Sequence, residues 1–392
     1  MSPTDHALPR VAVAVAGGSI GGLCAGIALR GYGADVDIYE RHAGSVETRG
    51  AGIVVQDELT GLLRRHGAPP LPTTSCRVRR YLEPAGGNGS AQAMPQRFTS
   101  WEAIYRTLRA TFPEAHYHTG AAIQGFETGG GAVRADVEGR GTVEADLLVV
   151  ADGAQSETRR RLLPDVAPHY AGYVAWRGTL DEADAPTGLA ASFDGAFTFS
   201  EARSGGHILA YLIPGANADV APGRRRLNWV WYTHADDADL DRLLTDRDGR
   251  RHRSSLPQGG AAEGVVTALR DTARREVHPR LAELVAATPD PFIQTIVDVV
   301  VPRTVFGRAC LLGDAAFVVR PHTAAAAAKA AGEATRLADA LRRAPADVDA
   351  ALASWQGGQL RAGRELTRYG VALGDRWAAA RTAPNEQCDR TP

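Results

Sequence analysis

Lysine is almost absent from this sequence. Lys329 is the only lysine among 44 basic residues, so a mechanism that needs a second lysine is excluded. Cysteine is also scarce: Cys24, Cys76, Cys310 and Cys388 lie far apart and form no CxxC pair. The sequence therefore indicates neither a metal site nor a disulfide framework. Scattered thiols of this kind are typical of a reducing compartment.

Excess charge and long apolar runs are missing as well. The formal net charge is −1, so no basic surplus is available to bind a nucleic-acid backbone. Residues 1–10 include Pro3, Asp5 and Pro9 and lack the basic start of a signal peptide. The apolar run 11–16 that follows is too short to cross a membrane. We therefore expect a soluble cytoplasmic protein that binds neither nucleic acid nor a membrane.

The chain of 392 residues is long enough for two or three domains, and its first forty residues carry the clearest pattern. Residues 11–16 form a short apolar run typical of a buried strand. A glycine-rich stretch, 17–22, follows, and apolar residues then recur at helical spacing up to residue 28. Residues 34–40 predict a second strand. Strand, glycine turn, helix and strand together indicate one βαβ unit of the dinucleotide-binding kind.

The remaining predicted elements are a mixture of strands and helices. In chain order they are neighbouring antiparallel strands at 207–213 and 227–233, an exposed loop without periodicity at 246–260, helices within 264–287, a buried strand at 305–312, an alanine-rich helix at 324–341 and a mostly helical segment at 347–380. For the 246–260 loop we favour a solvated loop over a lid. Glycines at 357, 358 and 363 weigh against one unbroken final helix.

The glycine turn has the chemistry of a pyrophosphate site. Gly17 permits a tight turn, Gly22 permits close packing of the helix, and the helix start offers free N–H groups and partial positive charge. Ser19 stands where the usual GxGxxG pattern has its second glycine. Glu40, at the end of the second strand, is placed to accept hydrogen bonds from ribose hydroxyls. The alternatives are a plain strand-to-helix turn and a solvated carboxylate.

Two further motifs follow predicted strands. The first is DGxxSxxR, running from Asp152 to Arg159, and the second is Gly313-Asp314, which precedes Pro321 and a helix. Each alone is compatible with a surface turn. Together, in this order after the glycine turn, they resemble the single-component flavin-dependent aromatic monooxygenases.

Several other segments narrow the resemblance to the 2,6-dihydroxypyridine 3-monooxygenase subgroup. They are residues 50–56, 99–101, 170–178, 227–232, 291–296 and 317–322. The serine in the glycine turn is also usual in that subgroup. The resemblance extends from about residue 11 to residue 341, nearly the whole chain.

This resemblance implies an α/β fold, α+β overall, in which a Rossmann-like FAD-binding domain is interrupted in sequence by an inserted antiparallel β-sheet substrate domain. The predicted FAD-binding domain comprises residues 1–70, 95–165 and 290–345, the β-rich domain comprises residues 71–94 and 166–289, and the C-terminal helical segment comprises residues 346–392. The implied reaction uses FAD, NADH or NADPH, and O2. It inserts one oxygen atom into an electron-rich aromatic or heteroaromatic ring through a flavin hydroperoxide. A homodimer is one assembly left open.

The resemblance also implies the site residues. Those expected to bind the cofactor are Gly17, Gly18, Ser19, Ile20, Gly22, Glu40, Arg41, Ile53, Val54, Gln56, Asp152, Gly313, Asp314, Thr323, Ala324, Ala325 and Ala326. Asp314 is expected to bind the ribityl hydroxyls, and the helix after Pro321 is expected to point its N-terminus at the pyrimidine end of the flavin.

Three residues are expected to act in catalysis: Pro321, His322 and Arg177. His322 is the acid–base candidate, although a histidine at this position is as often a helix cap. Arg177 is expected either to hold an anionic substrate or to bridge the two domains. His207 and Tyr211, on one face of a predicted strand, are weaker candidates.

Some positions depart from the family pattern. Phe317 replaces the usual histidine of GDAAH, as it does in the subgroup. A glycine is expected near Ala326 and an acidic residue at Gly332. Trp101 stands in place of an arginine near the adenine side, and its neighbour Arg106 is a candidate substitute.

Other functions fit the sequence less well. Trp229 and Trp231 form a WxW motif, but the lysine and flanking residues of flavin halogenases are missing. These tryptophans lie on one face of a predicted strand, with Asn228, Val230 and Tyr232 on the other; one face should pack and one should line a pocket, and which is which is open. Two alternatives to a hydroxylase remain. One is a flavin-binding protein that has lost oxygenation, and the other is a nicotinamide-linked dehydrogenase without flavin.

Overall fold

The predicted first strand lies inside a six-stranded sheet. The computed structural model describes residues 11–44, 51–345 and 347–379. In spatial order the sheet contains β17 (Val305–Phe306), β18 (Ala309–Leu311), β10 (Leu147–Val150), β1 (Ala12–Ala16), β2 (Asp35–Glu40) and β6 (Tyr117–Thr119). Neighbours from β18 to β6 are parallel, and β17 alone is antiparallel to its neighbour. The carboxyl ends of β18, β10, β1 and β2 therefore meet at one edge.

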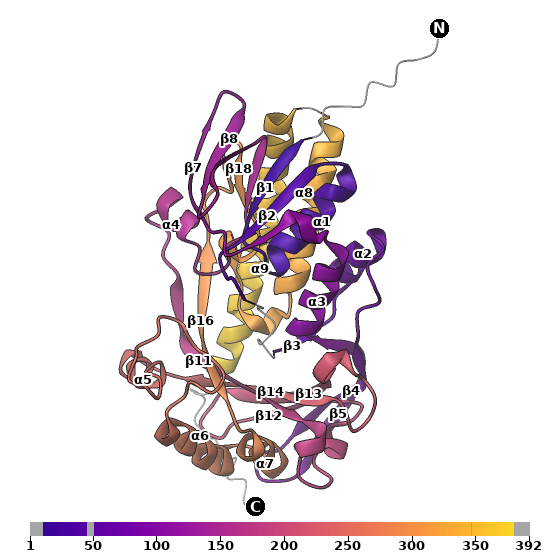
Figure 1. Ribbon diagram of the computed structural model, residues 1–392. Coiled ribbons are helices and arrows are strands. Elements are labelled where there is room, and N and C mark those ends of the chain that lie inside the picture. Colours follow the sequence, from indigo (N-terminus) through magenta and orange to yellow (C-terminus); the bar gives the residue numbers. More distant parts are fainter. Residues whose placement is uncertain (1–10, 45–50, 346, 380–392) are drawn as a thin grey trace, which may run out of the picture.

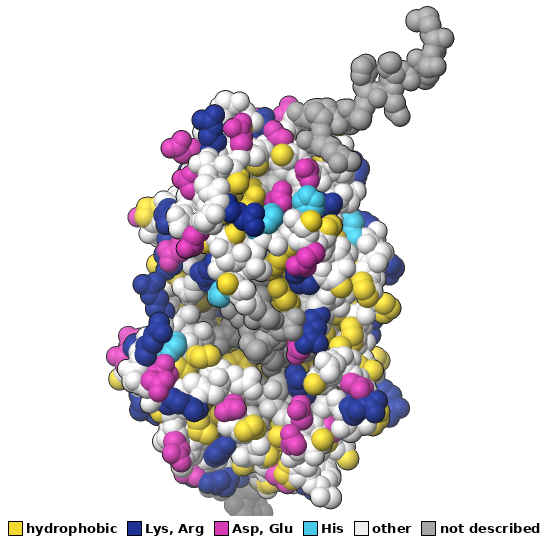
Figure 2. All heavy atoms as spheres, viewed as in Figure 1, with side chains coloured by type: hydrophobic (Ala, Val, Ile, Leu, Met, Phe, Trp, Pro, Cys, Tyr) yellow, Lys and Arg dark blue, Asp and Glu magenta, His cyan; other side chains and the backbone are white. Residues whose placement is uncertain are grey.

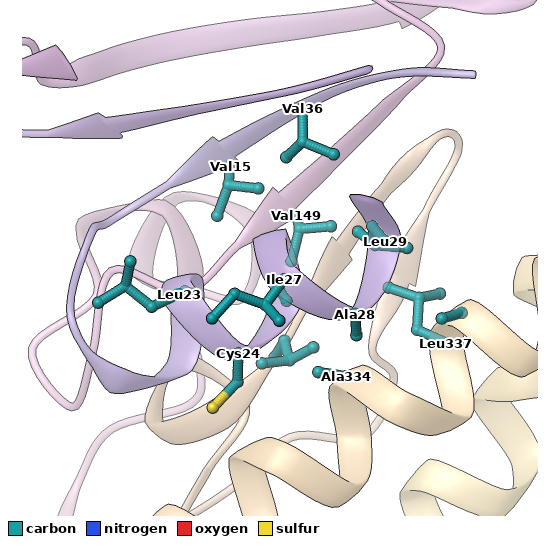
Figure 3. Packing of buried hydrophobic residues seen from close by; sticks show 14 of the residues in the cluster. Val15, Leu23, Cys24, Ile27, Ala28, Leu29, Val36, Val149, Ala334 and Leu337 are labelled. Carbon is teal, nitrogen blue, oxygen red and sulfur yellow. The ribbon is translucent and has the colours of Figure 1, made fainter. Parts of the chain in front are cut away.

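Helices α1 (Ile20–Tyr32) and α8 (Ala326–Arg343) cover one face of this sheet. Figure 3 shows Leu23 and Ile27 of α1 between the sheet, at Val15 and Val149, and Ala334 of α8. Alanine and glycine at the contact let the two helices approach closely. The apolar period predicted for α1 is confirmed.

A small antiparallel sheet covers the opposite face. It consists of β7 (Ile123–Gly129), β8 (Ala132–Val137) and β9 (Gly141–Ala145). Val133 and Val137 of β8 pack in one buried cluster with Leu148 and Val150 of β10. Because both faces are covered, the central strands β1, β10 and β18 are apolar along their whole length.

The second large sheet is mainly antiparallel and lies below the first in Figure 1. In spatial order it contains β15 (Ser255–Leu256), β16 (Phe292–Val300), β11 (His169–Asp181), β14 (Arg226–His234), β13 (His207–Ile213), β12 (Ala196–Glu201), β4 (Thr74–Leu82), β5 (Asn88–Ser100) and β3 (Gly52–Val54), and β19 (Phe317–Val318) pairs with β16. The predicted antiparallel pair β13 and β14 is confirmed.

Helices α6 (Glu263–Glu276) and α7 (Pro279–Ala287) close the far face of this sheet. Trp229 and Trp231 of β14 are 0% and 1% exposed and pack in the cluster that these helices contribute to. The Trp229 Nε1–H donates to Thr288 Oγ1 at 2.8 Å. The face of β14 that carries the tryptophans is therefore part of the hydrophobic core under α6 and α7. Val230 and Tyr232 lie on the opposite face of the strand, in a separate cluster.

The remaining helices surround the junction of the sheets. They are α2 (Asp57–Arg65), α3 (Trp101–Thr111), α4 (Glu157–Leu162), α5 (Asp237–Leu243) and α9 (Val348–Ala379). Helix α9 runs from the six-stranded sheet toward β11 and β16 (Figure 1) and packs on α8 and on the short turn η6 (Pro321–Thr323).

Two predicted elements need correction. Residues 305–312 form the hairpin β17–β18 rather than one strand, because Gly307 takes a positive φ of 58° in a tight turn. The helices predicted within 264–287 are present as α6 and α7, and Pro279 begins α7. The final helix is unbroken through its three glycines. A Cβ at Gly363 would be 2.5 Å from the ring of Phe317, so this glycine permits close packing.

Residues 246–260 are mostly exposed, as expected, but they include the short strand β15. Leu256 is 1% exposed and lies in β15, which pairs with β16 at the sheet edge. His252 Nε2 lies 2.7 Å from Asp246 Oδ2. Strand β15 thus joins this segment to the edge of the sheet.

Two strands lie outside the sheet to which the predicted boundaries would assign them. Strands β3 and β16 were expected in the FAD-binding domain, yet both pair in the second sheet. The overall two-domain division remains a prediction.

Candidate active site

Three strand ends that are far apart in sequence meet at one edge of the six-stranded sheet. An ideal Cβ on Gly17, after β1, would lie 3.0 Å from the Cα of Asp152, after β10. A Cβ on Gly313, after β18, would lie 3.9 Å from the Cα of Gly21. The structure therefore brings the glycine turn, the DG motif and the GD motif together, as expected from their positions after parallel strands.

The glycine turn leaves no room for side chains. Gly17 has φ of +99°, and a Cβ there would lie 2.6 Å from the Ala151 carbonyl oxygen. A Cβ at Gly22 would overlap the Gly17 carbonyl oxygen, so this glycine is required by the turn itself as well as by packing. Ser19 is the N-cap of α1, but its hydroxyl makes no capping hydrogen bond. Ile20 begins the helix, whose first N–H groups face the sheet edge.

Glu40 lies at the end of β2 against this turn. Its Oε2 accepts the Gly18 N–H at 2.7 Å, and its Oε1 accepts the His42 N–H at 2.9 Å. Burial raises the pKa of the Glu40 carboxyl, but these hydrogen bonds outweigh burial and leave the pKa below its usual value. The carboxylate is therefore ionised and fixed beside the turn. Arg41, the next residue, is exposed.

Tyr117 supports the same turn and was not predicted. Its hydroxyl donates to the Gly18 carbonyl at 2.9 Å and lies 3.1 Å from the Tyr105 hydroxyl. A Cβ at Gly18 would overlap this hydroxyl. Tyr117 comes from β6, about a hundred residues along the chain, and no local pattern in the sequence marks it.

Arg159 joins the second motif to the third. Its guanidinium donates to the carbonyl oxygens of Asp314 and Ala315, both at 3.2 Å, and of Ala154 at 2.7 Å. Arg159 is 1% exposed, and Ser156 Oγ accepts its backbone N–H. Asp152 Oδ1 is buried and, among the described residues, has no hydrogen-bond partner.

The GD loop is held from α8. Gly313 takes a φ of +68°, and its N–H donates to Glu333 Oε2 at 2.6 Å. Glu333 is 1% exposed, whereas the side chain of Asp314 is 41% exposed. The acidic residue expected at Gly332 is therefore Glu333, one position later.

The entry to α8 is braced by Gln56. Its side-chain amide donates to the carbonyl oxygens of Ala324 at 3.0 Å and Thr323 at 3.4 Å. Ala324 takes the left-handed conformation at φ +52°, which is unusual for a residue with a Cβ. Ala325 is the N-cap of α8 and Ala326 its first residue. The helix thus begins two residues later than predicted.

Ile53 and Val54 lie on β3, which pairs with β5 in the second sheet and not with the strands of the six-stranded sheet. The preceding Gly52 N–H donates to Asn228 Oδ1 at 2.8 Å. A Cβ on Gly52 would be 2.7 Å from the Tyr211 hydroxyl. This part of the chain therefore contacts the inner face of the second sheet.

A cluster of five rings lies where that inner face meets η6. We call Tyr173, His207, Tyr211, Tyr232 and His322 the ring face. His322 Nε2 lies 2.8 Å from the Tyr173 hydroxyl. The His322 ring centre lies 4.3 Å from that of Tyr232 and 5.5 Å from that of His207.

Burial sets the protonation of the ring face. Burial, then the charges of Arg320 and Arg177, lower the pKa of His322 to about 4. Burial and the neighbouring His322 lower the pKa of His207 to about 3. Burial also raises the pKa of Tyr232 to about 12 and that of Tyr173 well above its usual value. At neutral pH both imidazoles are neutral and both phenols keep their protons.

Arg177, on β11, extends over the same face. Its charge acts on Tyr211, Tyr232 and His322, opposing the rise that burial causes in the two tyrosine pKa values. Its Nε is buried and has no hydrogen-bond partner among the described residues. The neighbouring cation, Arg320, donates to Asp298 Oδ2 at 2.9 and 3.0 Å.

Comparisons with known proteins agree with this geometry. A protein-family model described as FAD binding domain-like matches residues 170–298, which include strands of the second sheet and helices α5 to α7. The chain is 36% identical to 2,6-dihydroxypyridine 3-monooxygenase of Paenarthrobacter nicotinovorans, over 93% of this chain and 89% of that protein. It is 26% identical to 6-hydroxynicotinate 3-monooxygenase of Pseudomonas fluorescens, over 85% of this chain and 83% of that protein.

Solved structures show the same fold. The structure of 2,6-dihydroxypyridine-3-hydroxylase from Arthrobacter nicotinovorans matches with a TM-score of 0.89 at 32% identity, over 97% of this chain and 96% of that chain. Klebsiella pneumoniae HpxO complexed with FAD and uric acid matches with a TM-score of 0.75 at 22% identity, over 95% of this chain and 90% of that chain. This chain belongs to the FAD-dependent aromatic monooxygenase family.

The residues at the strand ends of this monooxygenase fit FAD. The turn around Gly17 and Gly22 has no space for further side chains. Because the N–H groups of Gly17 and Gly18 are donated to Tyr39 and Glu40, the donors suited to a phosphate are those at the start of α1. Asp314 is a partly exposed carboxylate beside them, suited to a polyol. Asp152 Oδ1 and Lys329 Nζ are buried in the same region without hydrogen-bond partners among the described residues, so the protein groups alone do not satisfy this site.

Trp101, Arg106 and Phe317, where the chain departs from the family pattern, all contact other protein groups. Trp101 begins α3 and stacks on Tyr105 with ring centres 5.2 Å apart. Arg106, the candidate substitute for the family arginine, forms an ion pair with Glu102 at 2.8 Å. Phe317 is 0% exposed and packs in the core. It therefore fills space at the GD loop.

Two surface cavities lie away from the ring face. One of about 620 Å³ lies between β16 and α9, and another of about 490 Å³ lies between α4 and the three-stranded sheet. Neither is lined by a predicted site residue. Across residues 11–44, 51–345 and 347–379, no group of three or more His, Cys, Asp or Glu side chains could hold a metal ion, and no helix is long and apolar enough to cross a membrane. Positive and negative side chains are interspersed over the face in Figure 2.

Proposed function

We propose that the protein hydroxylates an electron-rich heteroaromatic ring that binds on the ring face as an anion or a hydrogen-bonded hydroxyl compound. The observation that carries this proposal is the position of Arg177. It is a cation whose buried Nε has no hydrogen-bond partner among the described residues, and its charge acts on His322, Tyr211 and Tyr232. A ring oxygen with negative charge is the ligand that this arrangement favours. The hydroxypyridine substrates of the named relatives have such oxygens.

FAD is proposed to lie across the edge where the three strand ends meet. The N-terminus of α1, with Gly17, Gly18, Ser19, Ile20 and Gly22, would hold the pyrophosphate, and Glu40 and Arg41 would lie at the ribose. Asp314 would bind the ribityl hydroxyls. The remaining cofactor contacts proposed are Ile53, Val54, Gln56, Asp152, Gly313, Thr323, Ala324, Ala325 and Ala326. When bound, FAD supplies the reduction of O2 and the transfer of one oxygen atom to the ring.

Protein groups would prepare the ring. Arg177 would hold its oxygen and favour the anionic form, which is the more electron-rich form. His322 and Tyr173, 2.8 Å apart, would relay the ring proton. One nitrogen of the neutral imidazole would accept the proton of the ring hydroxyl as the other nitrogen gives its proton to the Tyr173 oxygen, and the Tyr173 hydroxyl proton would leave to bulk water. Pro321 fixes the backbone at the start of η6 and thereby the direction of His322.

The reductant is proposed to be NADH or NADPH, and the protein is proposed to act in the cytoplasm. A homodimer remains open. These points stay predictions.

The test is substrate-stimulated NADH and NADPH consumption with a panel of hydroxypyridines, phenols and fused aromatics, with product analysis for one added hydroxyl. A yellow protein that never hydroxylates any ring would favour a flavin-binding protein that has lost oxygenation. A colourless protein without FAD would favour a dehydrogenase.

Arg177→Met is the sharpest variant for the substrate proposal. It should raise KM about 10- to 100-fold, because a charge-assisted hydrogen bond contributes roughly 1.5–3 kcal/mol, and should leave FAD affinity unchanged. Arg134→Met removes a charge from a side chain that is 69% exposed and should have no effect. An unchanged KM in Arg177→Met would refute the role of Arg177.

A further inference from the structure

The single lysine of the chain is buried at the base of the proposed flavin site. The Lys329 side chain is 4% exposed and lies in the first turns of α8. Its Nζ is 3.7 Å from Asp314 Oδ1 and 3.5 Å from Glu333 Oε1. Within the described residues, Nζ has no hydrogen-bond partner. The predicted site residues do not include it.

A buried ammonium with unused donors is costly unless a partner satisfies it. One of its two neighbours cannot move closer. Glu333 is fixed because its Oε2 accepts the Gly313 N–H at 2.6 Å, and it is 1% exposed. Asp314 is different: its carboxylate is 41% exposed and is the group proposed to bind the ribityl hydroxyls. Lys329 therefore stands between a fixed carboxylate and the carboxylate that would contact the cofactor.

The charges around the proposed flavin site also point to a role for Lys329. Asp314 and Glu333 would place two negative charges beside a cofactor that gains negative charge when it is reduced. Lys329 is the cation that the structure places within 4.0 Å of both. The residues beside Lys329 in the first two turns of α8 are alanines and a glycine, up to Glu333. Lys329 is therefore the positively charged side chain at the start of this helix. Removing it would leave the buried Glu333 without an ion-pair partner in this part of the described chain.

We propose that Lys329 is a positioning residue for the flavin: with Glu333 it holds the Asp314 carboxylate toward the cofactor, and its charge favours the reduced form. This inference rests on the proposed FAD function. The amine supplies a hydrogen-bond donor between the carboxylates of Asp314 and Glu333.

The test compares Lys329→Met and Lys329→Arg with wild type. FAD affinity is measured by fluorescence titration, and the midpoint potential by equilibration with a reference dye. Lys329→Met should weaken FAD binding about 10- to 100-fold and make the potential more negative. Lys329→Arg, which keeps the charge, should keep the potential close to that of wild type. Arg342→Met, with a side chain that is 55% exposed on the last turn of α8, is the matched control and should change neither.

Lys329→Met with wild-type affinity and wild-type potential would overturn the proposal while leaving the FAD function intact. Wild-type protein that takes up no FAD would overturn both. Titration of the wild-type protein with FAD comes first, so failure of the FAD function is distinguished from failure of the Lys329 proposal.

A second measurement needs no variant and covers the case in which Lys329→Met fails to fold. Protein labelled with ¹³C at lysine Cε gives one side-chain NMR signal, because the chain has one lysine. FAD should shift that signal, and ADP, which lacks the ribityl and flavin parts, should not. A signal that is identical with and without FAD would overturn the proposal.

Discussion

The strand-end edge and the ring face are built in opposite ways. At the edge, which we call the cradle, the essential features are backbone: the positive φ of Gly17, the overlap that any Cβ at Gly22 would create, and N–H groups at the start of α1. At the ring face the essential features are side chains, contributed by β11, β13, β14 and η6. The cradle is thus set by local sequence, and the ring face is set by how the second sheet is assembled.

This difference has a consequence for function. A backbone cradle accepts one cofactor and tolerates little change, whereas a side-chain face can be altered residue by residue. The variants that follow separate the two regions: changes to the cradle should remove FAD, and changes to the ring face should keep FAD and alter the reaction or its pH dependence.

The largest effect is expected at Gly22 of the cradle. Gly22→Ala should abolish FAD binding and lower the free energy of unfolding by about 3 kcal/mol or more, because the added Cβ overlaps a carbonyl oxygen that cannot move aside. Gly61→Ala in α2 is the control, since nothing lies within 4 Å of a Cβ there. It should bind FAD normally and be slightly more stable. FAD titration and thermal unfolding measure both, and FAD binding by Gly22→Ala would remove the backbone basis of the cradle.

The ring face should control acid stability. His322 and His207 have pKa values of about 4 and 3 in the folded protein, below the usual 6.5 of an unfolded histidine. Below pH 6.5 the unfolded chain therefore binds protons that the folded chain refuses. The contribution of each histidine to the free energy of unfolding is complete above pH 6.5. As the pH falls from 6.5 to the folded pKa of that histidine, the free energy of unfolding decreases by about 1.4 kcal/mol per pH unit.

Urea unfolding between pH 7 and pH 4 measures this loss. His322→Gln and His207→Gln should each make stability less dependent on pH, whereas His234→Gln, at an exposed position on β14, should not. Identical slopes in all four proteins would show that the buried histidines do not carry the acid sensitivity.

Tyr173→Phe tests the proton path without changing the shape of the ring face. It removes the hydroxyl that lies 2.8 Å from His322 Nε2. We expect kcat to fall about 10- to 100-fold, which is the lower part of the usual range for proton transfer, with KM and FAD affinity close to wild type. Steady-state kinetics at several pH values measure the split. A Tyr173→Phe enzyme with wild-type kcat would exclude this hydroxyl from the path.

The smallest effect is expected at Ala324, in the loop that connects the two regions. This residue has a φ of +52°, so Ala324→Gly should raise the free energy of unfolding by about 0.5–1 kcal/mol by relieving backbone strain. Ala331→Gly, at a buried position in the middle of α8, should lower it by at least about 1 kcal/mol. Equal losses in the two variants would contradict strain at Ala324.

The cradle could be predicted because its signals are local. A strand, a glycine turn and a helix follow one another within thirty residues, and Asp152 and Gly313 each follow an apolar run directly. Parallel strands then place their ends at one edge, as the sheet shows. The roles of Tyr117 and Arg159 were not predicted. Tyr117 contacts Gly18, 99 residues away, and Arg159 contacts the Asp314 carbonyl, 155 residues away.

The ring face could be predicted only in part. His322 and Arg177 stood out as single residues, but the pairing of His322 with Tyr173 depends on the register of β11 and on the approach of η6, 149 residues later. An acidic residue was expected at Gly332, whereas the carboxylate that contacts the GD loop is that of Glu333, one position later. The hairpin at Gly307 was missed because a short apolar run looks the same whether it turns or continues.

A crystal structure of the protein with FAD and a hydroxypyridine tests the central claim most directly. We predict the FAD pyrophosphate at the N–H groups at the start of α1, the ribityl chain within hydrogen-bond distance of Asp314, and the ring oxygen within that distance of Arg177 or His322. FAD bound elsewhere on the chain, or a flavin ring turned away from the side chains of Tyr173, Arg177 and His322, would contradict the account.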